Sequence, residues 1–182
     1  MDETAATSVV AELPAVLLEA EGLLCDAMQR NRVDGPSHTV STPSRYFIFR
    51  LAGIYGPGRR HLIEQVRSVS IAGNANHRLN LIHLDDIVDA IWLAFNAPES
   101  VPSGIFNLAD DGAASKKEVV DWMAAEMGLP PPTFSGTAAV GRRAITPDRI
   151  IDNAKIKSLL GWRPRFPSFR DGYKNRLALD SD

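Results

Sequence analysis

The segment YFIFRLAGIYGPGRR, residues 46–60, joins a short apolar run to a loop that contains three glycines. The run 46–52 is rich in aromatic and aliphatic residues, carries apolar side chains on both faces and is bounded by turn signals. It therefore predicts a strand buried inside a parallel sheet. A glycine-rich loop after such a strand can bind a dinucleotide when its backbone N–H groups point at the pyrophosphate. Residues 53–60 thus raise the question of whether this loop is a phosphate-binding site.

Several features of the loop argue against phosphate binding. Pro57 has no N–H to donate, and the spacing of Gly53, Gly56 and Gly58 differs from G-x-G-x-x-G. No acidic residue that could bind a ribose follows a next strand. We interpret the loop as a tight strand-to-helix turn that needs glycine for its dihedral angles, with Gly56 expected to hold a positive φ.

Length and composition indicate one globular domain over residues 1–182. Hydrophobic residues make up 45% of the 182 residues and charged residues 23%, and the formal net charge is −2. The absence of a basic block argues against nucleic-acid binding, and the absence of a long apolar run argues against a membrane span. The first residues lack the pattern of a secretory signal, and Cys25 is the single cysteine. We therefore expect the cytoplasm or another reducing compartment.

Hydrophobic periodicity and turn residues predict alternating helices and strands. Strands are expected at 46–52, 78–83 and 104–110, and helices at 14–30, 61–69, 84–97, 115–128, 152–162 and 168–177. Ser115 and Glu118 form a capping box, and Gly128 and Gly161 are expected to end their helices. This order predicts an α/β fold with a few short, mostly parallel strands and flanking helices. About three strands are fewer than a typical sheet holds, so strands are either missing or supplied by another chain.

Four segments resemble, in order, the C-terminal half of extended short-chain dehydrogenases/reductases, the NAD(P)-dependent epimerase/dehydratase family. They are FRLAGIYGPGR, NLIHLDDIVDAI, GIFNLADDGAASKKEVV and RIIDNAKIKSLLGWRPRFPSFRDGY. The resemblance implies a partial Rossmann-like fold, the substrate-side portion, without the N-terminal nucleotide-binding half. The intact family uses NAD or NADP, and we expect this chain alone to bind neither.

In that family a tyrosine and a lysine four residues apart perform the chemistry. Aligning the first helix on Glu19-Ala20-Glu21 places Leu13 and Leu17 at these two positions, and leucine cannot exchange a proton. Neither Tyr46 nor Tyr55 is followed by a lysine four residues later. No catalytic residue is therefore assigned, and no metal-ligand spacing is present.

The resemblance does assign residues to a substrate cleft. It implies that Arg50, Gly53 and Tyr55 line the space between nucleotide and substrate, and a surface arginine beside a turn is the alternative. His83 and Asp86 would shape the substrate side, and helix capping is the alternative for them. Arg149, with Arg142 and Arg143, forms a basic cluster near a plausible anion site, and solvated surface charge is the alternative.

Three functional hypotheses remain open from the sequence. The chain is an epimerase/dehydratase-like protein that is inactive alone, a Rossmann-derived interaction or scaffold subunit, or the substrate-binding half of a split sugar-nucleotide epimerase/reductase. In the family, strand 46–52 pairs with neighbours from the N-terminal half, so in this chain we expect one side of the strand to lack partners and Leu17, Leu18 and Leu24 to be exposed. We therefore expect a protein partner or self-association through this sheet edge.

Overall fold

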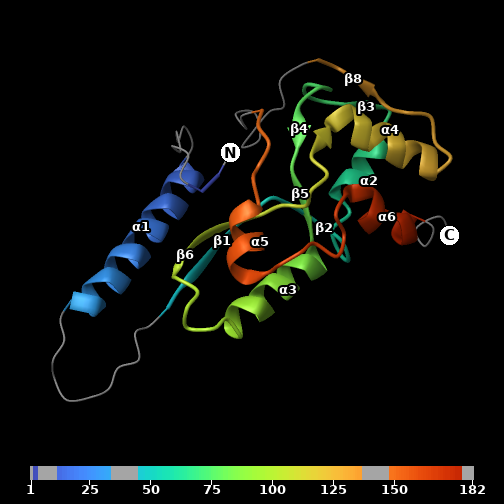
Figure 1. Cartoon of the computed structure of the whole chain (residues 1–182). Helices are drawn as coiled ribbons and strands as arrows, with labels where there is room; N and C mark the ends of the chain where they lie inside the picture. The colour runs from blue at the N-terminus through green and yellow to red at the C-terminus, as the bar shows by residue number, and fades with distance from the viewer. Residues whose placement is uncertain (1, 4–11, 34–44, 137–147, 178–182) are drawn as a thin grey trace.

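The computed structural model describes residues 2–3, 12–33, 45–136 and 148–177. Helices and strands alternate along most of the chain (Figure 1). The helices are α1 (Glu12–Val33), α2 (His61–Val66), α3 (Leu84–Phe95), α4 (Lys116–Glu126), α5 (Ala154–Leu160) and α6 (Phe169–Leu177). The strands are β1 (Phe47–Leu51), β2 (Gly53–Tyr55), β3 (Ser70–Ile71), β4 (Arg78–Leu79), β5 (Leu81–His83), β6 (Gly104–Leu108), β7 (Ala114–Ser115) and β8 (Thr133–Phe134). The predicted α/β class with short parallel strand pairs and flanking helices is confirmed.

The strand that opens the glycine-rich segment changes its partner at Ala52. β1 pairs in parallel with β6, and β2, which continues it, pairs in parallel with β5. The Ala52 N–H donates to Leu108 O (2.9 Å), and the next N–H, of Gly53, donates to Asn80 O (2.9 Å). The Asp110 N–H donates to Leu81 O (2.7 Å), so the start of β5 also bonds the end of β6. β5 therefore enters between the diverging ends of the other two strands.

Asn80 divides the predicted strand 78–83 into two parts. Its side-chain amide donates to Arg149 O (2.9 Å) and accepts from the Ile151 N–H (2.7 Å). β4, before Asn80, pairs antiparallel with β7, whereas β5, after it, pairs parallel with β2. The short strands β3, β7 and β8 were not predicted, because two residues cannot show an alternating pattern.

The glycine-rich loop is shorter than expected, because Gly53 lies in β2 rather than in the turn. The turn itself spans residues 56–59, where the Arg59 N–H donates to Gly56 O (3.0 Å). Gly56 has φ 122° and Gly58 has φ 77°, which confirms the expected positive φ at Gly56. A Cβ at Gly56 would also lie 3.1 Å from His83 Nε2.

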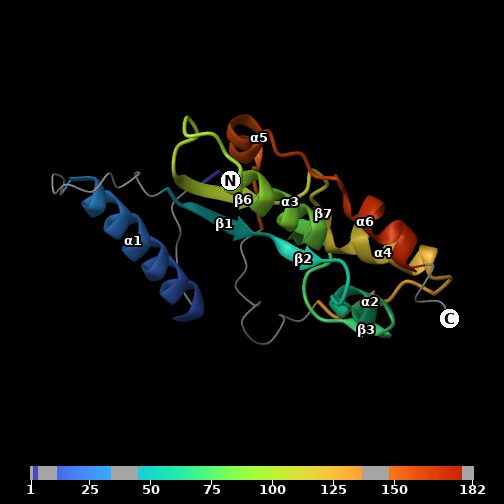
Figure 2. The ribbon, with the colours of Figure 1, turned by 90° about the horizontal axis from the view of Figure 1, so that it is seen from below.

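Two hydrophobic clusters fill the interior. One lies between the strands β1, β5 and β6 on one side and the helices α3 and α5 on the other. It contains Ile82, Phe106, Leu108, Ile156 and Trp162. The other joins α2, α4 and α6 to the end of β2, and contains Tyr55, Ile63, Met123, Phe169 and Tyr173. α1 stands apart from both clusters (Figures 1 and 2).

The helix α1 exposes most of its apolar side chains. Leu17 is 62% exposed and Leu24 is 43% exposed, as expected, whereas Leu18 is partly buried. A link between α1 and the strands is the ion pair of Glu21 with Arg50 (2.5 Å). The strand β1 was predicted to be buried, but its residues are only half-buried or exposed. The physical reason is that β1 has a strand neighbour on one side alone among the described residues.

The two outer edges of the β1–β6 pair differ. On the β6 edge, Lys155 Nζ donates to Ile105 O (2.6 Å), Glu3 accepts from the Asn107 N–H (2.8 Å) and Asn153 donates to Ala109 O (2.7 Å). The backbone groups of the even-numbered residues of β1 form hydrogen bonds with β6, as does the N–H of Ala52, which follows β1. The backbone groups of residues 47, 49 and 51 therefore point to the opposite edge. No hydrogen-bond partner is found there within the described ranges. The β6 edge is therefore closed by side chains, whereas the β1 edge is open as far as the described part of the chain is concerned.

Gly172 permits the close packing of α6 on β2. A Cβ at Gly172 would lie 2.4 Å from Cε2 and the hydroxyl oxygen of Tyr55, whereas a Cβ at Gly22 in α1 would have nothing within 4 Å. We expect Gly172→Ala to lower the free energy of unfolding by about 1–3 kcal/mol, because the Tyr55 ring must move. The matched control Gly22→Ala should raise it by roughly 0.5–1 kcal/mol, because alanine favours the helix.

Urea denaturation of the two variants measures both effects. If Gly172→Ala stabilised the chain as Gly22→Ala does, the tight contact between α6 and Tyr55 would be contradicted.

Candidate functional site

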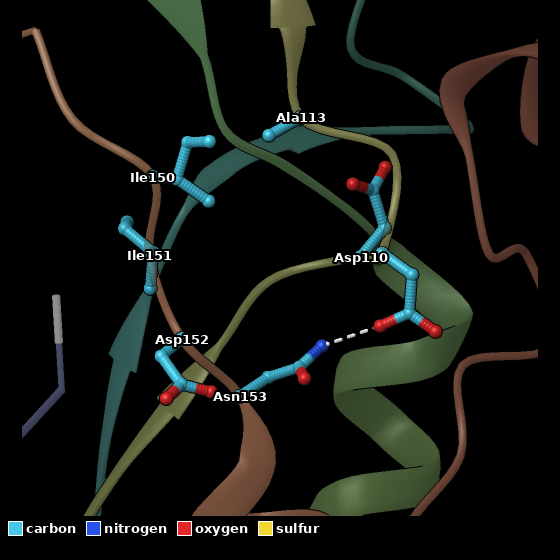
Figure 3. A pocket seen from close by; sticks show the side chains of 7 residues that line it. Asp110, Ala113, Ile150, Ile151, Asp152 and Asn153 are labelled. Atoms are coloured by element: carbon cyan, nitrogen blue, oxygen red, sulfur yellow. Dashed lines mark hydrogen bonds between the residues drawn. The ribbon is translucent and has the colours of Figure 1, made fainter.

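A cavity of about 280 Å³ lies where β6 ends, at the point where the strands diverge. It is lined by Asp110, Asp111, Ala113, Ile150, Ile151, Asp152 and Asn153 (Figure 3). The carboxyl ends of parallel strands at a change of partner are the usual place for ligands in open α/β sheets. The position and lining of this cavity make it the candidate functional site.

Hydrogen bonds hold the segment 150–153 across the end of β6. Asn153 Nδ2 donates to Ala109 O (2.7 Å) and to Asp111 Oδ1 (2.8 Å), and Asn107 Nδ2 donates to Asp152 O (3.2 Å). The Asn80 amide holds the same segment from the other side. The wall of Ile150 and Ile151 is therefore fixed opposite the wall of Asp110 and Ala113 (Figure 3).

Asp110 is the unusual side chain of this cavity. It is 5% exposed, and its Oδ1 accepts from the Gly112 N–H (3.1 Å). Its Oδ2 is buried and has no hydrogen-bond partner in the described part of the chain. Burial, together with the nearby charges of Asp111, Asp86 and Asp171, raises the pKa of Asp110 to about 7, against the smaller opposing effect of the Gly112 bond.

The neighbouring Asp111 behaves in the opposite way. Burial acts to raise its pKa, but hydrogen bonds from Asn153 and from the Lys157 ammonium outweigh burial and lower the pKa below its usual value. The pKa values of these two adjacent carboxyl groups are thus shifted in opposite directions. Asp111 is paired with Lys157, whereas no cation among the described residues is bonded to Asp110.

Tyr55, His83 and Asp86 are brought together, but inside the protein. The Tyr55 ring is 1% exposed, stacks on Tyr173 (4.8 Å between centroids), and meets the His83 ring edge-on (5.2 Å). Its hydroxyl donates to Ser168 O (3.2 Å). Burial, followed by the charges of Asp110 and Asp86, raises the pKa of Tyr55 above its usual value.

His83 and Asp86 hold neighbouring backbone. His83 Nδ1 accepts from the Asp85 N–H (3.2 Å) and caps α3. Asp86 is fully buried, and its carboxylate accepts from the N–H groups of Arg165 (2.6 Å) and Phe166 (3.2 Å). Burial raises the pKa of Asp86, although these two bonds oppose the effect. Asp86 therefore ties α3 to the segment that precedes α6.

The other predicted site residues lie elsewhere. Arg50 points toward α1, where it binds Glu21, and its pKa is raised mainly by that hydrogen bond. Gly53 is a strand residue whose N–H is bonded to Asn80 O. Arg149 is partly buried, its carbonyl accepts from Asn80, and it directly precedes the cavity segment. Arg142 and Arg143 lie outside the described residues.

Asp110 and Asn153 were not among the predicted site residues. The signal for Asp110 was present, because the acidic pair in NLADDG follows a strand, and carboxyl ends of parallel strands are where ligands bind. Nothing in the sequence pattern pointed to Asn153, which reads as an ordinary residue before a helix.

A search for other sites within the described ranges finds no cluster of three His, Cys, Asp or Glu residues placed to hold a metal ion. In the same ranges no helix combines the length and the apolar character that crossing a membrane requires.

Residues 37–109 match the model of the NAD dependent epimerase/dehydratase family. Protein YeeZ of Escherichia coli K12 is 32% identical over 120 residues, which cover 66% of this chain and 40% of YeeZ. A 3-diazoavenalumate denitrifying reductase of a Streptomyces species is 28% identical over 69% of this chain and 45% of that protein. The chain thus spans less than half the length of the curated relatives it matches.

Solved structures share the fold over nearly the whole chain. A functionally unknown conserved protein from Silicibacter pomeroyi has a TM-score of 0.76 and 24% identity, over 100% of this chain and 60% of that one. MoeE5, solved with UDP-glucuronic acid and NAD, has a TM-score of 0.77 and 22% identity, over 99% of this chain and 58% of MoeE5. These similarities establish the Rossmann-like fold, and the family resemblance expected from the sequence is confirmed.

The pKa of Asp110 predicts a pH-dependent stability. The unfolded chain releases this proton near pH 4 and the folded chain near pH 7, so the folded state holds more protons in between and loses stability as the pH rises. Asp110→Asn keeps an oxygen for the Gly112 N–H and removes the titration. We expect the variant to gain on the order of 3 kcal/mol relative to the wild type between pH 4 and pH 7.

Thermal melts across pH 4–8 measure this difference. Asp89→Asn, which removes one carboxylate from an exposed ion pair with Arg165, is the matched control for the change of net charge. A constant difference between Asp110→Asn and the wild type over this range would contradict the assignment.

Proposed function

We propose that this chain is the substrate-side portion of an NAD-dependent epimerase/dehydratase fold, because residues 37–109 match the model of that family. In this proposal it lacks a nucleotide-binding loop and a Tyr/Lys catalytic pair of its own, and it is inactive alone. The observation that carries the proposal is the geometry of residues 53–60, the segment most similar to a nucleotide loop.

Two backbone N–H groups of this segment are bonded inside the protein, and one position has no N–H. Gly53 donates to Asn80 O, Arg59 donates to Gly56 O, and Pro57 has no N–H. The following helix α2 has only six residues, and no side-chain cap is formed at Arg60. A pyrophosphate is bound by successive free N–H groups at a helix N-terminus, and this turn does not offer them. The residues present therefore do not fit the cofactor, which supports the proposed lack of nucleotide binding.

The positions of the tyrosines support the proposed lack of catalysis. The chain has three tyrosines, and the residues four positions later are Arg50, Arg59 and Leu177. Tyr55 is enclosed by Tyr173 and His83, and its raised pKa opposes proton release. Leu17, which occupies one catalytic position by resemblance, is an exposed residue of α1. The side chain of Leu13 lies outside the described residues.

The proposal predicts that the chain does not bind NAD or NADP. Isothermal titration of the folded chain with each cofactor should show no saturable heat up to millimolar cofactor, because neither the pyrophosphate nor the ribose has a binding group. MoeE5, which was solved with NAD, is the positive control. Micromolar binding of either cofactor to this chain alone would contradict the proposal.

A second candidate function is that of an interaction subunit, and the asymmetric sheet edges favour it. The β6 edge is closed by Lys155, Glu3 and Asn153, whereas the backbone groups of residues 47, 49 and 51 have no partner among the residues that the structure describes. An open edge is a template for another strand. The occupant would be a strand of a protein partner, including the nucleotide-binding half of a split enzyme, or a second copy of this chain.

Leu51 offers a specific test of association through the β1 edge. Its N–H points outward and its side chain is 42% exposed, so Leu51→Pro removes an edge donor without removing a bond to β6. We expect the wild type to form dimers or larger species at low micromolar concentration, and Leu51→Pro to shift it toward the monomer. Leu51→Ala, which keeps the N–H, should associate like the wild type.

Light scattering coupled to size exclusion measures the three masses, and circular dichroism checks that each variant is folded. A stable wild-type monomer in the absence of any partner would contradict self-association. Equal dissociation of both variants would assign the contact to the Leu51 side chain rather than to strand pairing.

A further inference from the structure

Asp110 presents a buried carboxyl oxygen without a partner at the wall of a cavity. Buried polar groups are normally hydrogen-bonded, and an exception calls for an explanation. Asp110 is 5% exposed and lines the cavity, and its Oδ2 has no partner among the described residues. A hydrogen-bond donor brought by a ligand would satisfy this oxygen.

The charges around Asp110 decide which kind of donor fits. Asp111 on the same segment, Asp86 on α3 and Asp171 on α6 all act on Asp110, and Tyr55 on β2 faces it as a neutral hydroxyl. The cation Lys157 is bound to Asp111, and the charge of Arg163 also acts on Asp111. Asp152 adds a third carboxylate to the lining. The site therefore repels phosphates and carboxylates and favours a positively charged donor.

The opposite wall of the cavity is apolar. Ile150 and Ile151 lie opposite Asp110 and Ala113, so a ligand there would pack hydrocarbon on one side and place its polar end on the other (Figure 3). The volume of about 280 Å³ is near the lower end of ligand pockets, which start at ~300 Å³, so the ligand is small.

We propose that this cavity binds a small aliphatic cation, an alkylammonium or alkylguanidinium group, which donates hydrogen bonds to Asp110 while its hydrocarbon part packs on Ile150 and Ile151. The site goes beyond the proposed function, because it requires neither a nucleotide nor the partner at the β1 edge.

The proposal includes a proton linkage. An ionised Asp110 binds a cation more strongly than a protonated one, so binding releases the Asp110 proton below about pH 7. The affinity should therefore rise by at least about tenfold between pH 5.5 and pH 8 and then level off. A neutral donor of the same size would show no such rise.

Methyl and carboxyl NMR of the folded chain tests the site directly. The probes are n-butylammonium, n-butylguanidinium, n-butanol and butyrate, which share a chain and differ in the charge of the polar end. We expect the two cations to shift the Ile150 and Ile151 methyl signals and the Asp110 carboxyl signal saturably. We expect butanol to bind at least about tenfold more weakly, and butyrate not to bind.

Two variants, each of which replaces one carboxylate by an amide, complete the experiment. Asp110→Asn should abolish the cation-dependent shifts, and its amide NMR spectrum shows whether it is folded. Asp89→Asn, which removes a half-buried carboxylate of α3 that does not line the cavity, should leave them unchanged. Equal binding of butanol and the cations, or cation binding that survives Asp110→Asn, would overturn the proposal, as would the absence of any saturable shift.

Discussion

Three backbone hydrogen bonds at the ends of β1, β5 and β6 govern the arrangement of the rest of the molecule. Because Ala52 bonds Leu108 while Gly53 bonds Asn80, the continuous strand must leave β6 and join β5 within one residue. The cavity lined by Asp110 lies directly after the end of β6, next to this change of partner. Asn80 supports this divergence from both sides, since its carbonyl holds β2 and its amide holds residues 149–151.

The sequence was sufficient for the fold class and for most elements. Helix 14–30 was found as Glu12–Val33, and the apolar runs at 46–52, 78–83 and 104–110 all contain strands. These predictions succeeded because a repeat of apolar residues, or a capping residue such as Ser115, acts on residues that are close to it in the sequence. The division of the runs at Ala52 and Asn80 could not be predicted, since it depends on which distant strand lies alongside.

The candidate site was harder to predict, and the reason lies in burial. Tyr55, His83 and Asp86 were chosen by resemblance, and the structure places them in an aromatic and hydrogen-bonded cluster with Tyr173 and Phe166. Asp110 next to Asp111 looks like a solvated acidic pair in the sequence. Only the folded chain shows that one carboxyl is compensated by Lys157 and Asn153 while the other has an oxygen without a partner.

The closure of the β6 edge by side chains also limits how copies of this chain could assemble. A sheet with two open edges can add copies without end, as fibres do. Here Lys155, Glu3 and Asn153 occupy backbone groups along one edge. Two copies that use the same β1 edge must meet antiparallel about a two-fold axis, and that contact consumes both open edges. Pairing of two copies through the β1 edge would therefore use the open edge of the β1–β6 pair in each copy and leave that pair without a further edge for strand addition among the described residues.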